Sequence, residues 1–148
     1  MYWATRKMRL VVSRVIKFRV WDTKVNEWLF GTSGFSMDGE IVLMGEWSAA
    51  AWRAISEGEA DRYVLLQYTG LKDKNASEIY EGDILRYQWQ SNWGDRERID
   101  RRFSVVFENG QFLQLEQDEE TPDHWYQWDS LEVIGNIYEN PELLKAGA

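Results

Sequence analysis

The residues best suited to chemistry in this chain are four carboxylates in one short stretch. They are Asp73, Glu78, Glu81 and Asp83. Carboxylate oxygens bind Mg²⁺ and Ca²⁺, and two of them can act together as general acid and base. The spacing is not that of an EF-hand loop, and two lysines lie among the acids. Turn capping and solvated charge explain the group better, so we expect neither a catalytic residue nor a metal here.

Other catalytic constellations are missing from the sequence. The chain has no cysteine, which excludes disulfides, thiolate metal sites and a cysteine nucleophile. Its one histidine, His124, follows Asp123, but no G-x-S-x-G nucleophile elbow is present for it to serve. The glycine-rich loops that hold phosphates or dinucleotides are also missing. The sequence therefore predicts a protein that is not an enzyme and uses no cofactor.

Aromatic residues offer a different kind of chemistry, because the chain has nine tryptophans. Three aromatics lie together at Trp125, Tyr126 and Trp128. Trp and Tyr are enriched at binding surfaces. In a strand, this spacing would put aromatic side chains on both faces, one toward the core and one toward a partner. We therefore take these three residues as a candidate interaction site.

A second aromatic segment also carries arginines and indicates an alternative function. Its members are Trp89, Trp93, Arg96, Arg98, Arg101 and Arg102. Cations beside stacking rings are typical of proteins that bind single-stranded nucleic acid. Three acids within residues 95–102 dilute this charge, and the acidic remainder of the chain would repel phosphates. Nucleic acid is therefore the less favoured partner.

The net charge of −8 is distributed very unevenly. Residues 1–24 carry seven basic side chains and one acid, whereas residues 25–148 carry ten basic and 24 acidic ones. A basic arm and an acidic body attract each other, so homo-oligomers are a plausible expectation. No apolar run approaches the roughly 20 residues of a membrane span, and basic residues interrupt every apolar run near the start. We expect a cytoplasmic protein with no membrane contact.

The sequence patterns predict a mainly β fold, with a small barrel-like core and one short helix. Seven or eight strands are expected, and the best helix candidate is 48–55. Asn109-Gly110 between two apolar runs predicts a hairpin with a type I′ turn. Residues 31–39 and 90–102 are expected to form loops. We divide the chain into a basic N-terminal extension, 1–14, and a single β-rich domain, 15–148.

Three segments resemble the YopX family of small phage and prophage proteins. They are Ile16–Asp22, Leu66–Asn75 with its continuation Glu78–Ile84, and Glu132–Pro141. The sequence departs from the family pattern at Ala76, where the family usually has glycine. It also departs at the first 14 residues, which precede the usual start. Without glycine at position 76 we do not expect an Asn-Gly type I′ turn here, although Asn75 alone can take the left-handed conformation.

The resemblance implies a β-rich, partly barrel-like fold and a gene carried by a bacteriophage or prophage. It implies no particular reaction. Together with the composition, this predicts a phage accessory protein that acts as a non-enzymatic interaction module in the bacterial cytoplasm. Its expected partner is a host or phage protein, or a second copy of itself. The alternative is a single-stranded nucleic-acid-binding protein that uses the segment 89–102.

Overall fold

The computed structural model describes most of the chain after the basic extension. The described residues are 17–29, 32–35, 41–44, 60–91, 94, 97–116, 123 and 126–145. The predicted extension 1–14 and the predicted helix 48–55 lie outside these ranges.

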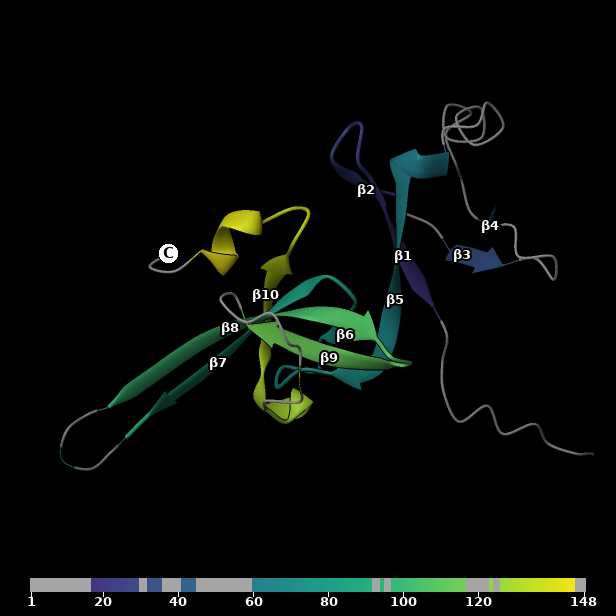
Figure 1. Ribbon diagram of the computed structural model, residues 1–148. Helices are drawn as coiled ribbons and strands as arrows, with labels where there is room; N and C mark the ends of the chain where they lie inside the picture. The colour runs from purple at the N-terminus through teal and green to yellow at the C-terminus, as the bar shows by residue number, and fades with distance from the viewer. Residues whose placement is uncertain are drawn as a thin grey trace, which may run out of the picture.

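Two four-stranded antiparallel sheets make up most of the described structure, and one of them is curled into a half-barrel (Figure 1). The first has the order β2-β1-β5-β6, and the second has the order β10-β7-β8-β9. The strands of the first sheet are β1 (Phe18–Asp22), β2 (Glu27–Leu29), β5 (Tyr63–Lys72) and β6 (Glu78–Tyr80). Those of the second are β7 (Asp83–Gln90), β8 (Arg98–Glu108), β9 (Gln111–Glu116) and β10 (Glu132–Asn136). The prediction of a mainly β, barrel-like fold is confirmed.

Short elements complete the fold. The strands β3 (Thr32–Phe35) and β4 (Ile41–Met44) form a separate two-stranded sheet. The only helical elements in the described ranges are the 3-10 turns η1 (Ala60–Arg62), η2 (Trp128–Ser130) and η3 (Pro141–Leu144). None of the helices in this part of the chain is long and apolar enough to cross a membrane.

Local turn chemistry explains several of the strand connections. Asn109 and Gly110 have φ values of 51° and 80°, so both central residues of the β8–β9 turn are left-handed. This is the requirement of a type I′ turn, and the prediction for this hairpin is confirmed. The β1–β2 turn uses Asp22, whose Oδ1 accepts the amide of Lys24 at 3.0 Å. Asn26 ends the turn with a φ of 56°.

Two of the predicted loops contain strands instead. Thr32–Phe35 within the expected loop 31–39 is strand β3, paired with β4. The strand β8 begins at Arg98, so the last part of the expected loop 90–102 is paired with β7. In both segments glycine or charged residues hide the apolar alternation that identifies a strand, and pairing with a neighbouring strand overrides the local preference.

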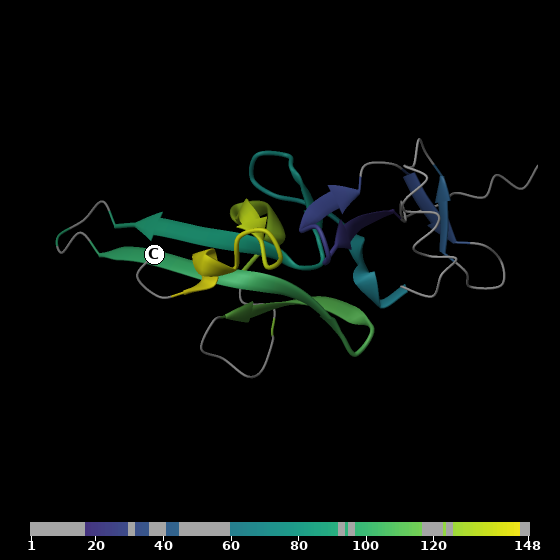
Figure 2. The ribbon, with the colours of Figure 1, turned by 90° about the horizontal axis from the view of Figure 1, so that it is seen from above.

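The core lies at the centre of the second sheet, on the face that looks toward β6. Its fully buried members are Ile79, Leu85, Phe103, Val105 and Leu131. Beyond this core, the outer halves of β7 and β8 continue as a two-stranded ribbon that extends away from the rest of the molecule (Figures 1 and 2). The ribbon is the largest projection of the described structure.

Candidate interaction sites

The carboxylates of residues 73–83 do not converge on one site. Asp73 closes the β5–β6 turn, where its Oδ1 accepts the amides of Asn75 and Ser77, each at 2.8 Å. Its Oδ2 accepts the amide of Val133 at 2.9 Å and so fastens the turn to β10. Burial raises the pKa of Asp73, but these three hydrogen bonds together lower it more, and the net pKa lies below its usual value. Asp73 therefore has a structural role.

Glu78 and Asp83 are each neutralised by a basic residue of the first sheet. Glu78 forms an ion pair with Lys17 and accepts the Tyr80 hydroxyl at 2.9 Å. The hydrogen bond from Lys17 is the main reason that the pKa of Glu78 lies below its usual range. Asp83 is buried and forms an ion pair with Arg19. The described residues contain no cluster of three or more metal-binding side chains.

The β7–β8 ribbon carries the predicted nucleic-acid segment, and its outer part has no neighbouring strand within the described residues. β10 pairs with β7 only along Asp83–Arg86, and β9 pairs with β8 only along Phe103–Glu108. Beyond those points Tyr87–Gln90 pairs with Arg98–Arg101 alone. An isolated pair of strands is only marginally stable in water. This part of the sheet therefore leaves both of its edges open.

The two faces of the ribbon differ sharply. Trp89 lies opposite Ile99 and on the same face as Tyr87, so this face continues the apolar face of the core pair Leu85 and Phe103, interrupted by Arg101 opposite Tyr87. The Trp89 side chain is 45% exposed. The other face carries polar and charged side chains, namely Arg86, Gln88, Gln90, Arg98 and Asp100. The core's apolar face thus runs outward into solvent and ends at Trp89.

The predicted arginines do not form one positive groove. Arg101 makes two hydrogen bonds to the Glu116 carboxylate, at 2.8 and 2.9 Å, and Arg102 donates to the Leu143 carbonyl at 2.7 Å. Arg98 lies 3.7 Å from Asp100 and is the most exposed of the three. It shares a shallow cavity of about 200 Å³ with Trp89, Gln88 and Gln90. Trp93 and Arg96 lie outside the described residues.

The predicted aromatic site at residues 125–128 proves to be packed against the core in its described part. Tyr126 stacks on Tyr87 with ring centroids 3.9 Å apart, and its amide donates to Gln114 Oε1 at 3.0 Å. Trp128 packs against the same core cluster and begins the 3-10 turn η2, so the expected strand at this point is wrong. Trp125 and His124 lie outside the described residues. Tyr126 and Trp128 mainly fill the gap between the sheet and its covering loop.

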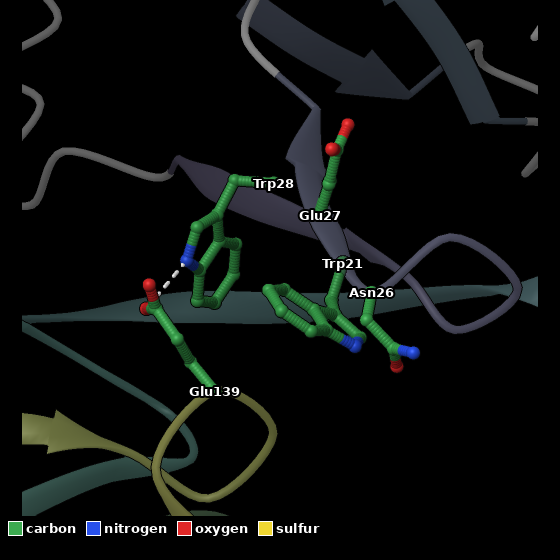
Figure 3. Close-up of a pocket in the computed structure, with 5 residues that line it drawn as sticks. All are labelled: Trp21, Asn26, Glu27, Trp28 and Glu139. Carbon is green, nitrogen blue, oxygen red and sulfur yellow. Dashed lines mark hydrogen bonds between the residues drawn. The ribbon is translucent and has the colours of Figure 1, made fainter.

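A pocket that the sequence analysis missed lies between the β1–β2 hairpin and the turn after β10 (Figure 3). Its volume is about 360 Å³, and its lining residues are Trp21, Asn26, Glu27, Trp28 and Glu139. Trp21 and Trp28 are cross-strand partners whose rings meet edge to face, with centroids 4.8 Å apart and planes at 70°. Trp28 Nε1 donates to Glu139 Oε2 at 2.9 Å.

Only part of this pocket could be found in the sequence. The hairpin register that pairs Trp21 with Trp28 follows from the turn at 22–26, so the two rings were within reach of prediction. Glu139 lies 111 residues from Trp28 and follows a different sheet, so no local pattern connects them.

Comparisons with known proteins agree with this architecture. The crystal structure of protein EF1440 from Enterococcus faecalis is 31% identical and superposes with a TM-score of 0.56. The match covers 90% of this chain and 100% of that one. No curated protein sequence matches the chain. The family model described as YopX protein matches residues 17–145, which include almost all of the three segments that resembled the family. By this match over most of its length, the chain belongs to the YopX family.

Proposed function

We propose that this protein is a non-enzymatic accessory protein of a phage or prophage that binds another protein through the outer part of its β7–β8 ribbon. The observation that carries the proposal is the exposed Trp89 at the end of a face that continues the core. The proposed partner is a host or phage protein in the bacterial cytoplasm.

The energetics of the ribbon favour a partner. Exposed tryptophans that become buried in an interface are the residues that most often dominate its binding energy. A partner that covers Trp89 would also support two strands that lack a neighbour within the described residues. A polypeptide suits this surface because it can bury the apolar face and pair with an open edge at the same time.

The charges of the ribbon favour protein over nucleic acid. Affinity for nucleic acid comes mainly from basic residues that contact phosphates. Arg101 and Arg102 already bind groups of this chain, and Asp100 lies beside Arg98. The net charge of −8 opposes phosphates further. The carboxylates of the 73–83 stretch, which are bound by backbone amides and basic side chains, support the non-enzymatic part of the proposal.

The test is capture of a partner from a lysate of the bacterium that carries the gene, with and without nuclease, followed by reconstitution with the purified partner. Trp89→Ala should weaken the reconstituted complex by about 2 kcal/mol, or thirtyfold in Kd. The matched control is Phe107→Ala, which removes an aromatic of similar exposure, 47%, near the other end of β8 and should leave Kd unchanged. Equal binding by the wild type and Trp89→Ala would refute the ribbon as the docking surface.

Two further measurements separate the alternatives. The first is a nuclease control combined with oligonucleotide binding. If nuclease abolishes the capture and a fluorescent single-stranded oligonucleotide binds at low salt, the partner is nucleic acid and not a protein. Native mass measured at low and high salt would reveal a second copy as the partner. If the native mass shows a complex that contains only this chain, and Trp89→Ala abolishes it, the partner is a second copy of this protein and not a host or phage protein.

A further inference from the structure

We propose that the Trp21–Trp28–Glu139 pocket is a receptor for an arginine side chain of a partner polypeptide. This site is separate from the ribbon and goes beyond the function proposed above. The protein already holds one of its own arginines, Arg19, on the same tryptophan.

Arg19 shows how this region binds a guanidinium group. Its Cζ lies 4.7 Å from the ring centroid of Trp28 and 4.1 Å from that of Tyr80. The same guanidinium forms an ion pair with Asp83. Two aromatic rings and one carboxylate therefore enclose the cation, which is the combination that arginine prefers because its planar group stacks on rings and binds carboxylates by hydrogen bonds.

The pocket repeats these components beside the same tryptophan. Its two rings, Trp21 and Trp28, meet edge to face at 70°. Trp21 is 3% exposed and forms a buried wall, whereas the partly exposed Trp28 offers the accessible ring. Glu139 supplies the carboxylate, and Trp28 Nε1 holds one of its oxygens at 2.9 Å. Figure 3 shows this carboxylate beside the edge of Trp28, with the ring of Trp21 next to them. Tyr138 stacks on Trp21 at 6.2 Å and supports that wall.

What differs between the two sites is the cation. None of the five described residues that line the pocket is basic, whereas two of them, Glu27 and Glu139, are acidic. Glu27 points away from Glu139 in Figure 3, so it adds negative potential at the rim and Glu139 is the direct partner. The pocket's negative charge and aromatic walls therefore complement a cation supplied from outside.

The pocket is large enough to hold one side chain. A volume of about 360 Å³ lies near the lower end of the range of about 300–1,000 Å³ that is usual for small-molecule pockets. The pocket also opens at the surface, between a hairpin turn and the turn after β10. An arginine that projects from a partner's backbone can enter such a site while the rest of that partner stays outside.

The probe is an end-capped Gly-Arg-Gly-Arg-Gly peptide, and its control replaces each arginine by citrulline, which keeps the shape but removes the charge. The readout is the indole N–H resonance of Trp28 in ¹⁵N NMR spectra, assigned with Trp28→Phe. The arginine peptide should shift this resonance and saturate, and the citrulline peptide should not. Equal shifts with both peptides, or none with either, would overturn the proposal.

Glu139→Gln tests the carboxylate without removing either ring. It should weaken binding of the arginine peptide about two- to fivefold, as expected for an ion pair at an exposed site. The matched control is Glu142→Gln, an exposed glutamate in η3 outside the pocket, which should leave binding unchanged. If both variants lose the same affinity for the arginine peptide, the effect comes from the overall charge of the protein and not from this site, and the proposal is overturned.

Two further variants identify the source of the arginine and separate this site from the ribbon. Replacing Arg6, Lys7, Arg9 and Arg14 by glutamine in the full chain should leave the affinity for the peptide unchanged. A tighter affinity would mean that the chain's own basic segment occupies the pocket, and would overturn the external partner. Trp89→Ala should also leave peptide binding unchanged, so failure of the ribbon proposal and failure of this one give different results.

Discussion

Arg19 of β1 and Asp83 of β7 form an ion pair across 64 residues and thereby join the two sheets. The Asp83 carboxylate, which is 1% exposed, also accepts the amide of Tyr80 at 2.8 Å and the Asn136 side chain at 3.2 Å. Burial raises the pKa of Asp83, and Arg19 together with these hydrogen bonds acts against that shift. The charge is tolerated in the interior because all of these groups surround it.

The first prediction concerns this pair. Arg19→Met leaves Asp83 buried without its cation and should lower the free energy of unfolding by about 3–5 kcal/mol. The measurement is urea denaturation at neutral pH. Arg101→Met is the control, because the Arg101–Glu116 pair is exposed and should contribute less than about 1 kcal/mol. Similar losses in the two variants would contradict the structural importance of the buried pair.

The second prediction concerns the β5–β6 turn. The sequence allows Asn75 the left-handed conformation here, but Ala76 adopts it, with a φ of 65°. The Cβ of alanine makes this conformation unfavourable, by about 1–2 kcal/mol, whereas glycine adopts it freely. Ala76→Gly should therefore raise the free energy of unfolding by about 1 kcal/mol and increase Tm. Asn75→Gly should give no such gain, and equal effects of the two changes would refute the assignment.

The third prediction is the pH dependence that Asp73 imposes. Burial raises its pKa in the folded protein, but three backbone amides that donate hydrogen bonds to its carboxylate hold that pKa below the usual value for an aspartate. The stability that its charge provides is therefore complete above that value and is lost as the pH falls through the folded pKa. Asp73→Asn should cost about 1–3 kcal/mol at neutral pH. Denaturation curves measured down to about pH 2 should show this difference shrinking, and a constant difference would contradict the prediction.

The fourth prediction concerns Asp100 on the polar face of the ribbon. The hydrogen bond from Arg86 is the main cause that lowers the pKa of Asp100 to about 2. Arg86→Gln should move this pKa back toward its ordinary value, as followed by NMR titration of the carboxyl carbon. Arg98→Gln should change it little, because Arg98 lies 3.7 Å from the carboxylate. A larger shift from Arg98 than from Arg86 would disprove the pairing.

The fifth prediction concerns divalent cations. The oxygens of Asp73, Glu78 and Asp83 already accept hydrogen bonds or form ion pairs with this chain's own groups. Millimolar Mg²⁺, Mn²⁺ or Ca²⁺ should therefore leave the melting midpoint unchanged, since only a ligand that binds the folded state raises it. A rise that disappears in Asp73→Asn would instead establish a metal site in this stretch.

The sequence by itself determined the fold class, the family and many of the local turns. The two apolar runs beside Asn109-Gly110 predicted the β8–β9 hairpin, because a strand with one buried face must repeat every second residue. Asn109-Gly110 identified its turn, since both residues accept positive φ at low cost. These features depend on short stretches of chain and can therefore be read from them.

The tertiary structure alone decided which distant residues meet. The start of β8 could not be recognised from its polar sequence, because pairing with a neighbouring strand rather than local preference makes Arg98–Arg101 extended. Trp28 contacts Glu139, and Arg19 contacts Asp83, only when both sheets are in place. Ala76 is held left-handed by the hydrogen bonds of Asp73, which override its own preference. Contacts between sheets depend on the packing of the whole chain, and no local pattern contains that information.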